Sequence, residues 1–328
     1  MSKIKAALLA GAIAAGSVGI GGNALTAGAS MIDRSKVEAA FVSFSTVFDM
    51  KLKNTPVIYP QIATVIPGVS ERIEFKWLSS IPTMKRWVGD RTMQRLRGET
   101  QALTTEWWAN GIEVDVDDLN NEAKFGMIVK RIRSLATAAA RRMDQEVVNY
   151  YVNGFAGTLG VTYDGQFCFD TDHTAAGNGI GTQQSNLLTG AFSSTTVNTA
   201  IQRAMLITDD EGEPIGVTPM RALVGPQNQL AVRQVLKQEF LANGASNIDR
   251  GLLDAALISP RITGTHWFVL TDEEIQAVIL GIEVAPQFVS ADDPASFEMF
   301  MRRNALYGAH TKFGICYGMW QAAMGSLG

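Results

Sequence analysis

The sequence has few of the residues on which most enzyme and metal sites depend. Its 328 residues include two cysteines and three histidines, and the histidines lie far apart along the chain. Cys168 and Cys316 lack the spacing of a metal-ligand pair and give no disulfide framework, which fits a reducing compartment. The sequence contains no P-loop, no Gly-x-Ser-x-Gly elbow and no His-Glu-x-x-His motif. These absences argue against the familiar nucleotide-binding, serine-hydrolase and zinc-protease classes.

The sequence also lacks a surplus of basic residues and a long uninterrupted apolar run. Its 28 Lys and Arg residues stand against 32 Asp and Glu residues, which gives a formal net charge of −4. A dedicated nucleic-acid-binding protein needs a basic surplus to neutralise phosphates, so the composition argues against that class. The apolar residues 6–20 are too few, and too often interrupted by glycine, to span a membrane.

The first 30 residues allow two interpretations. Two early lysines, the apolar residues 6–20 and the Ala-Gly-Ala sequence at 27–29 are arranged as in a secretory signal. However, a stretch of alanine and glycine with no charge between Lys5 and Asp33 can also lie extended against another molecule. We favour an ordered arm along a neighbouring molecule, and a cleaved secretory signal is the alternative.

Residues 75–91 are the most informative part of the sequence. Trp77 and Trp87 lie on either side of Pro82, and a basic cluster accompanies them: Lys85, Arg86 and Arg91. This segment is too apolar for a solvated loop, yet too charged and too broken by proline for a core helix. Large aromatic side chains combined with arginine are typical of protein interfaces. We therefore expect these rings to pack against another molecule, and an ordinary surface hairpin is the alternative.

Hydrophobic periodicity predicts two helices and two strands in the first half of the chain. Residues 33–52 have the spacing of one amphipathic helix. Residues 72–78 and 106–118 alternate with a period of two, which predicts half-buried strands joined by a long two-stranded excursion. Residues 119–153 predict a helix of roughly 30 residues, or on the order of 45 Å at 1.5 Å per residue. A capping region precedes this helix, and Asn153-Gly154 ends it.

Charges of opposite sign occupy neighbouring blocks of the sequence. Residues 68–100 hold seven basic and four acidic residues, residues 101–122 hold six acidic and no basic residues, and residues 123–143 hold six basic and no acidic residues. Three of the acids, Glu113, Asp115 and Asp117, are predicted to share one face of a strand. Such blocks suit subunits that meet in a fixed register. Each block taken alone is better explained as a solvated face of a strand or a helix.

The second half of the chain predicts an α+β arrangement. Residues 176–196 indicate a long loop, and helices are expected at 196–206 and 227–243. Four strands are expected in this half: Arg221–Val224, Trp267–Leu270, Ala277–Leu280 and Phe297–Met301.

One cluster could hold a metal or support acid–base chemistry. Asp170, Asp172 and His173 lie within four residues of one another. One short segment rarely supplies a complete coordination shell, and Asp-Thr-Asp is an ordinary turn former. We therefore predict no metal, cofactor or catalytic residue.

Three segments of the sequence carry motifs of one known protein family. The first is Lys76-Trp77-Leu78 with Ile81-Pro82 and the run from Met84 to Arg91. The second is Tyr163-Asp164-Gly165 followed by Phe169-Asp170 and His173. The third runs from Asn304-Ala305-Leu306-Tyr307-Gly308 to Gly318-Met319-Trp320-Gln321. In these segments and their order over about residues 31–325, the sequence resembles the Mu-type major head subunits, the capsid proteins of Mu-like tailed phages. The resemblance is weakest in the first 30 residues and around 176–260.

The resemblance implies an α+β fold of the Hong Kong 97 type. It implies an N-terminal arm at 1–56, an extended loop at 57–105, a peripheral domain with a long spine helix at 106–155 and 296–328, and an axial domain at 156–295. Many copies would then self-assemble into the icosahedral head shell that encloses double-stranded DNA of a tailed phage or prophage. The predicted subunit-interface residues are Trp77, Pro82, Lys85, Arg86, Trp87, Arg91, Glu113, Asp115 and Asp117.

Further expectations concern partners and alternatives. The subunits would form hexamers and pentamers in a virion assembled in the host cytoplasm, without membrane contact or sequence-specific DNA binding. A portal, a scaffold or maturation protease, and a decoration protein are candidate partners. A covalent cross-link from Lys76 or Lys85 to an Asn of a neighbour is not expected, because the sequence reveals no third residue to catalyse it. The alternatives are an encapsulin-like nanocompartment and a secreted metal-dependent enzyme.

Overall fold

The computed structural model describes residues 34–75, 101–119, 121–174, 182–209, 212–240, 244–291 and 297–328. All of them belong to one compact unit, Arg34–Gly328. Helices and mixed sheets together confirm the α+β class. Six predicted interface residues lie outside the described residues: Trp77, Pro82, Lys85, Arg86, Trp87 and Arg91.

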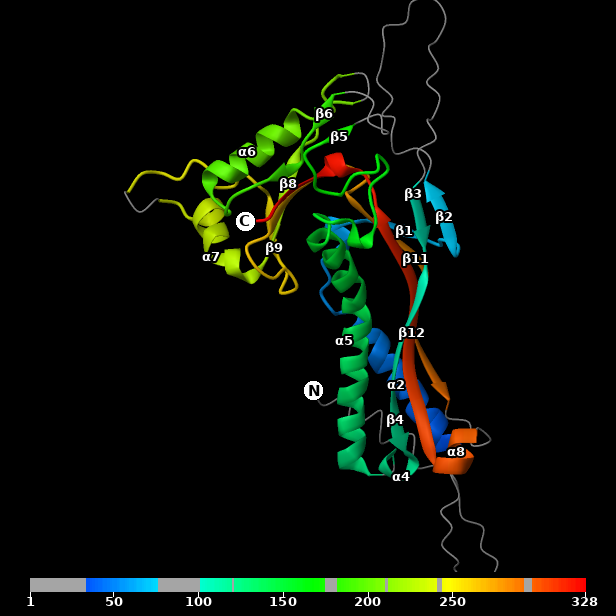
Figure 1. The fold of residues 1–328 in the computed structure, drawn as a ribbon. Coiled ribbons are helices and arrows are strands. Elements are labelled where there is room, and N and C mark those ends of the chain that lie inside the picture. The colour runs from blue at the N-terminus through cyan, green and yellow to red at the C-terminus, as the bar shows by residue number, and fades with distance from the viewer. Residues whose placement is uncertain are drawn as a thin grey trace, which may run out of the picture. The chain divides into compact units, whose positions relative to one another are not determined.

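A four-stranded sheet has the strand order β1-β11-β12-β4 (Figure 1). Its strands are β1 (Thr64–Pro67), β11 (Val278–Ala291), β12 (Asn304–Tyr317) and β4 (Glu106–Asp115). The long strand β12 pairs antiparallel with both β11 and β4, while β1 pairs parallel with β11. Along β12, buried and partly exposed residues alternate from Asn304 to Phe313. This alternation means that one face of the sheet is covered and the other is open.

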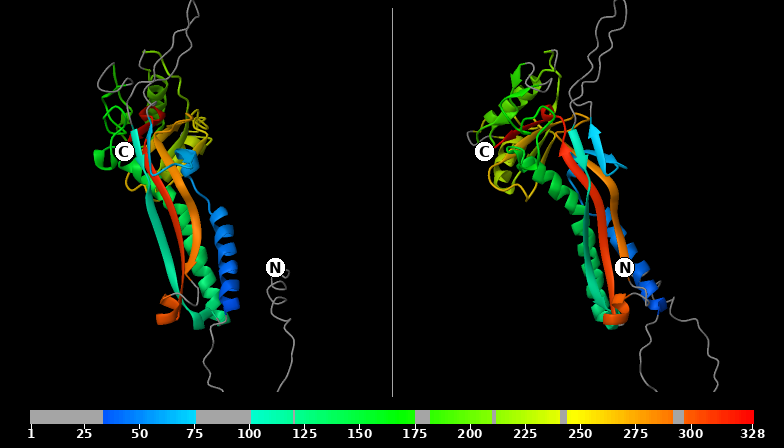
Figure 2. Two further views of the ribbon diagram at one scale, coloured as in Figure 1. Left: turned by 90° about the vertical axis from the view of Figure 1, so that its right-hand side faces the viewer. Right: turned by 45° about the vertical axis from the view of Figure 1, so that its right-hand side comes forward.

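Two helices, α2 (Arg34–Lys53) and α5 (Glu122–Val152), cover the buried face (Figure 2). Phe44 of α2 is fully buried, with its ring centroid 5.1 Å from Tyr307 of β12 and 5.2 Å from Phe125 of α5. The side chain of Asn121 accepts hydrogen bonds from the backbone N–H groups of Ala123 and Lys124, which satisfies donors at the start of α5. Both helices lie where the sequence periodicity predicts them.

A second, five-stranded sheet has the order β7-β13-β10-β8-β9. Its strands are β7 (Leu187–Leu188), β13 (Ala323–Ser326), β10 (Trp267–Thr271), β8 (Pro219–Val224) and β9 (Ala255–Ile258). Helix α6 (Ser194–Met205) packs on this sheet and begins with a capping box between Ser193 and Thr196. Trp267 and Trp320 are completely buried in this part of the core.

The base of the predicted excursion is a two-stranded ladder of β2 (Arg72–Phe75) and β3 (Gln101–Thr104). Phe75 and Leu103 are buried in the chain's own core, so this base does not depend on a neighbouring molecule. It lies directly against glycines of the large sheet: a Cβ atom at Gly281 would be 2.9 Å from a methyl carbon of Leu103. The base of the excursion is therefore packed on the core of its own chain.

Several predicted elements are wrong or displaced. Strand β4 ends at Asp115, and the next residues form the short helix α4 (Val116–Leu119). Residues 297–301 form the helix α8 (Phe297–Arg302) and not a strand. The helix expected at 227–243 is replaced by three short turns that end at Lys237: η2 (Pro226–Asn228), α7 (Gln229–Val232) and the π-helical η3 (Arg233–Lys237).

Other elements are longer or more numerous than predicted. Strand β11 continues to Ala291, well beyond the four residues expected. The expected loop at 176–196 contains β6 (Gln183–Gln184) and β7, and β6 pairs with β5 (His173–Thr174). Three short turns complete the described elements: α3 (Tyr59–Ile62), η1 (Gly157–Leu159) and η4 (Trp320–Ala322). None of the helices in the described ranges is both long and apolar enough to cross a membrane.

Strand pairing crosses the predicted domain boundaries. Strand β11 comes from the segment 156–295 but pairs with β12 in the sheet that also contains β4. Strand β13 comes from the segment 296–328 but pairs with β10 in the other sheet. The division into arm, extended loop, peripheral domain and axial domain stays a prediction.

Candidate subunit interface

The face of the large sheet opposite α2 and α5 carries an exposed tryptophan beside a largely covered lysine, Lys312, which pairs with Glu283 at 2.9 Å. Trp107 of β4 and Lys312 of β12 are direct cross-strand partners, so their side chains share a face. The ammonium of Lys312 lies 5.5 Å from the Trp107 ring centroid, and the His310 ring lies 5.5 Å from the same ring. Trp107 is 60% exposed. A tryptophan this exposed on an open sheet is typical of a contact surface.

A hollow lies further along the same face, where two glycines pair across the strands. Gly111 of β4 is the direct partner of Gly308 of β12, and Val289 of β11 lies opposite Gly308 on the other side. Leu306 and Glu113 form the next cross-strand pair on the same face. The hollow has a volume of about 400 Å³ and a mainly apolar lining. We call it the glycine hollow, defined by Gly111, Glu113, Val289, Leu306 and Gly308.

The glycines keep the floor of this hollow low. A Cβ atom at Gly308 would lie 3.2 Å from the carbonyl oxygen of Asn110 and 3.6 Å from a methyl of Val289. A Cβ atom at Gly111 would lie 3.1 Å from the carbonyl oxygen of Tyr307. Any side chain at either position would therefore be crowded by the sheet and would fill the space above it.

The predicted acidic residues gather at the end of β4, beside the hollow. Glu113 accepts a hydrogen bond from the side-chain amide of Asn304, and Asp115 accepts one from the backbone N–H of Asp117 at 2.8 Å. Asp117 pairs with Arg303 at 3.0 Å. Glu113 and Asp115 share the strand face as predicted, but Asp117 belongs to α4. These carboxylates are solvent-exposed, so they contribute little to the stability of the single chain.

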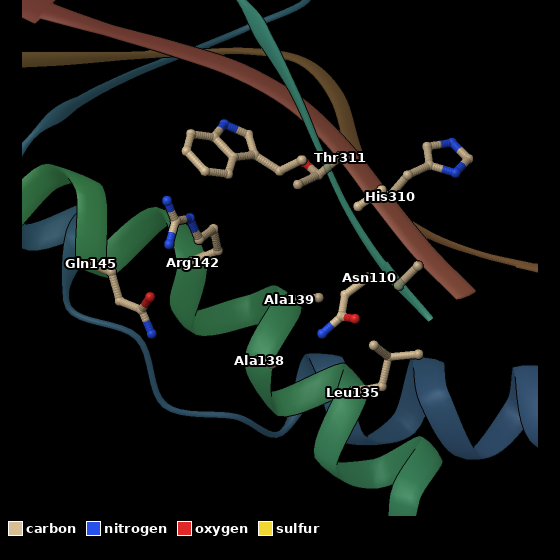
Figure 3. A pocket seen from close by; sticks show the side chains of 11 residues that line it. Asn110, Leu135, Ala138, Ala139, Arg142, Gln145, His310 and Thr311 are labelled. Carbon is tan, nitrogen blue, oxygen red and sulfur yellow. The ribbon is translucent and has the colours of Figure 1, made fainter. Parts of the chain in front are cut away.

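A second cavity lies on the other side of the sheet, between α5 and strands β4 and β12 (Figure 3). It has a volume of about 300 Å³ and is lined by Leu135, Ala138 and Ala139 together with several polar side chains. The guanidinium of Arg142 lies 3.8 Å from the Trp108 ring centroid. It also pairs with Glu146 at 2.6 Å, so the charged group of this lining is already neutralised within α5.

The candidate metal cluster is built into a turn. Asp172 accepts a hydrogen bond from the side chain of Gln166 at 3.1 Å, and Asp170 accepts one from the backbone N–H of Thr171 at 2.7 Å. His173 is completely buried and points to a different partner. Within the residues that the structure describes, no group of three or more His, Cys, Asp or Glu side chains is placed to share a metal ion.

The partner of His173 is Asp164, and this pair is a structural centre. The Nδ1 atom of His173 lies 2.8 Å from Asp164 Oδ2, and its ring stacks on Trp320 with a centroid distance of 4.3 Å. Burial raises the pKa of the Asp164 carboxyl, but hydrogen bonds from His173, Thr162 and Gln166 outweigh burial, so the pKa is below its usual value. The pair therefore anchors the turn to η4 near the C-terminus.

Two important features have no clear signal in the sequence. Buried Asn186 donates from its side chain to the carbonyl oxygens of Cys168, Trp320 and Ala323 at 2.7, 3.0 and 3.2 Å. A single asparagine in a polar stretch gives no hint of this role. The glycine hollow is equally hidden, because its residues come from three strands and β4 lies far from β11 and β12 along the chain.

The fold defines the class of protein. It is similar to the procapsid protein of bacteriophage JBD30, with a TM-score of 0.57 and 20% identity over 89% of this chain and 75% of that chain. The architecture is thus the Hong Kong 97-type fold of phage capsid subunits, as the sequence predicts.

The family follows from the sequence comparison. The profile of the Mu-like prophage major head subunit gpT matches residues 37–195, 190–262 and 255–327, and the chain belongs to this family. It is 32% identical over 151 residues to the FluMu prophage major head subunit of Haemophilus influenzae, and 25% identical over 152 residues to the major capsid protein of Escherichia phage Mu. Each match covers 46% of this chain and 48% of the relative.

Proposed function

We propose that the chain is a major capsid protein that self-assembles into the icosahedral head shell around the double-stranded DNA of a tailed phage or prophage. Family membership and fold support this function. The structural observation that supports this function most directly is the open face of the large sheet, where Trp107 and the glycine hollow lie uncovered by the described residues. A face of this kind needs a partner, and in a shell the partner is another copy.

The same proposal assigns a role to the predicted interface residues. The glycine hollow, at about 400 Å³, has room for a tryptophan side chain, and its rim carries Glu113 with Asp115 close by. The segment that contains Trp77 and Trp87 is basic and aromatic, so its residue types suit an apolar hollow with an acidic rim. This segment of one copy would dock on the glycine hollow of the next.

Further elements of the proposal follow from the shell. The subunits would group as hexamers and pentamers in the virion, and assembly would take place in the host cytoplasm. A portal, a scaffold or maturation protease and a decoration protein would be partners. The chain would divide into arm, extended loop, peripheral and axial parts, and strand pairing supports moving β11 to the peripheral part and β13 to the axial part. The family match favours a phage head over an encapsulin-like compartment, and the proposed role requires no catalytic residue, metal or cofactor.

Electron microscopy of the purified full chain tests the function. We expect closed shells of many copies, whereas a preparation that contains only single 35.4 kDa chains would contradict the proposal.

A charge swap tests whether the segment that contains Trp77 and Trp87 docks on the glycine hollow. Glu113→Lys with Asp115→Lys should reduce the yield of shells at least tenfold, and adding Arg86→Glu with Arg91→Glu should restore most of it.

A matched control separates docking from general charge effects. Asp254→Lys with Asp272→Lys makes the same change of net charge at distant positions and should leave the yield of shells unchanged. Circular dichroism should give the same secondary structure for every variant. If the swapped residues fail to rescue a well-folded variant, the hollow is not the docking site of this segment.

A further inference from the structure

Both segments that lead into the predicted excursion are hydrogen-bonded to the same irregular part of strand β11. The pairing of β11 with β12 shifts its register directly after Ile282, so Glu283 lies in a β-bulge. On the outgoing side, the backbone N–H groups of Gly68 and Val69 donate to the carbonyl oxygen of Ile282 at 2.9 and 3.3 Å. On the returning side, the hydroxyl of Thr105 donates to a carboxylate oxygen of Glu283 at 2.5 Å.

Thr105 lies at the point where the excursion joins the large sheet. It is the single residue between β3, which belongs to the base of the excursion, and β4, which belongs to the sheet (Figure 1). Its backbone N–H donates to the carbonyl oxygen of Glu71, directly before β2, at 3.0 Å. Glu283 binds Thr105 through one carboxylate oxygen and accepts a hydrogen bond from Lys312 on the other, at 2.9 Å. We call Thr105, Glu283 and Lys312 the clasp.

The clasp fixes geometry more than it stabilises the fold. The side chains of Glu283 and Lys312 are 25% and 12% exposed, and an ion pair in contact with water typically adds little to folding stability. Hydrogen bonds from Thr105 and Lys312 hold the pKa of the Glu283 carboxyl below its usual value, so the carboxylate is ionised near neutral pH. Without Glu283, the Thr105 hydroxyl can still donate to the carbonyl oxygen of Glu71, 3.3 Å away, so no buried donor is left unpaired.

We propose that Glu283 is a positioning residue that sets the direction of the excursion for its docking on the next copy. This inference rests on the proposed function and names a residue on which that docking depends. Residues 76–100, arranged as the two strands that the sequence predicts, would reach about 40 Å from the sheet at about 3.3 Å per residue. A rotation of about 10° at Thr105 would then move the far end by roughly 7 Å. Apolar contacts need heavy atoms within about 4.5 Å, so a rotation of this size would abolish the docking.

A distance measurement in the unassembled full chain tests the positioning directly. Cys168 and Cys316 are buried, so spin labels would attach to the cysteines introduced by Ser80→Cys in the excursion and Lys130→Cys on exposed α5. Electron paramagnetic resonance should give a narrow distribution of label distances with Glu283 in place. Glu283→Ala should at least double the width of this distribution, and an unchanged width would overturn the inference.

The chain offers a matched control for this substitution. Glu146 pairs with Arg142 at 2.6 Å and is 20% exposed, so Glu146→Ala removes the same charge from a similar pair that lies within α5. This control should leave the distribution of distances unchanged. Equal broadening in both variants would contradict a specific role of Glu283.

The yield of shells supplies an independent measurement. Glu283→Ala and Thr105→Val should each lower the yield at least tenfold, whereas Thr105→Ser keeps the hydroxyl and should retain most of it. The urea midpoint of the unassembled chain should stay the same in all three variants. A midpoint that falls together with the yield would mean that the clasp supports the fold, and the inference would be wrong. Absence of shells from the unmodified chain would contradict the proposed function instead, and the distance measurement would still decide the role of Glu283.

Discussion

At the scale of single residues, this fold depends on positions where the backbone of one element touches the backbone of another. Gly314 of β12 lies under β3, and a Cβ atom there would overlap the carbonyl group of Thr104. Because a backbone carbonyl cannot rotate away like a side chain, this contact requires glycine. The position fixes how the base of the excursion lies on the sheet.

We expect Gly314→Ala to destabilise the chain by about 2 kcal/mol or more, because overpacking a rigid contact typically costs about 1–3 kcal/mol. Gly126→Ala is the matched control. Gly126 is exposed within α5 with no atom near its missing Cβ, so alanine there should stabilise by about 0.5–1 kcal/mol. Urea unfolding of the unassembled chain measures both. Equal effects of the two substitutions would show that the backbone of β3 does not contact Gly314.

The Asp164–His173 pair predicts a pH dependence. The pKa of Asp164 is lowered in the folded chain, so its carboxylate stabilises the fold above its ordinary pKa of 3.8. This contribution is lost as the pH falls through the lower folded-state pKa. We expect the free energy of unfolding to decrease below about pH 4. Asp164→Asn should be less stable at pH 7 and should have a flatter profile below pH 4; an unchanged profile would contradict this role.

At the scale of elements, the sequence predicts what is local and misses what is paired at a distance. Helices α2 and α5 are correct because their apolar residues repeat along one segment. The strand predicted at Phe297–Met301 is wrong, because this segment forms the helix α8. Its residues Phe297, Met299 and Met301 alternate as in a strand, but over only five residues. Strand β11 is underpredicted because Glu283 and Pro286 interrupt its pattern, yet pairing with β12 carries it on to Ala291.

The attachment of α2 to the sheet gives a prediction at this scale. Phe44 is fully buried against Tyr307 and Phe125, so Phe44→Ala should cost about 3–5 kcal/mol through lost contacts and a new cavity. Val42 lies on the same helix but is 62% exposed, and Val42→Ala should change stability by less than about 0.5 kcal/mol. Thermal unfolding of the two variants checks this difference. Similar losses would mean that α2 is not packed through its aromatic face.

At the scale of the whole molecule, the family and the fold class could be recognised from ordered motifs, but the hollow that we propose as the docking surface could not. The motifs lie within single segments, and their residue types are visible in the sequence. The glycine hollow exists only after Gly111, Val289 and Gly308 come together from three strands. The predicted acids Glu113 and Asp115 lie on its edge, and their role in a contact between copies stays a prediction.

Contacts between copies in a shell should add to the stability of each folded chain. A partner that binds only the folded chain stabilises it by about 2.7 kcal/mol at a hundred times its dissociation constant, so shells should melt several degrees above unassembled chains.

Leu306→Asp puts a charge in the glycine hollow and should lower the melting temperature of shells by more than 5 °C. It should barely affect the unassembled chain, because Leu306 lies on the open face of the sheet. Leu230→Asp, at a residue 67% exposed on α7, is the control and should leave both states unchanged. Scanning calorimetry of the two states measures this, and an equal loss in shells and unassembled chains would mean that Leu306 supports the fold and not the contact between copies.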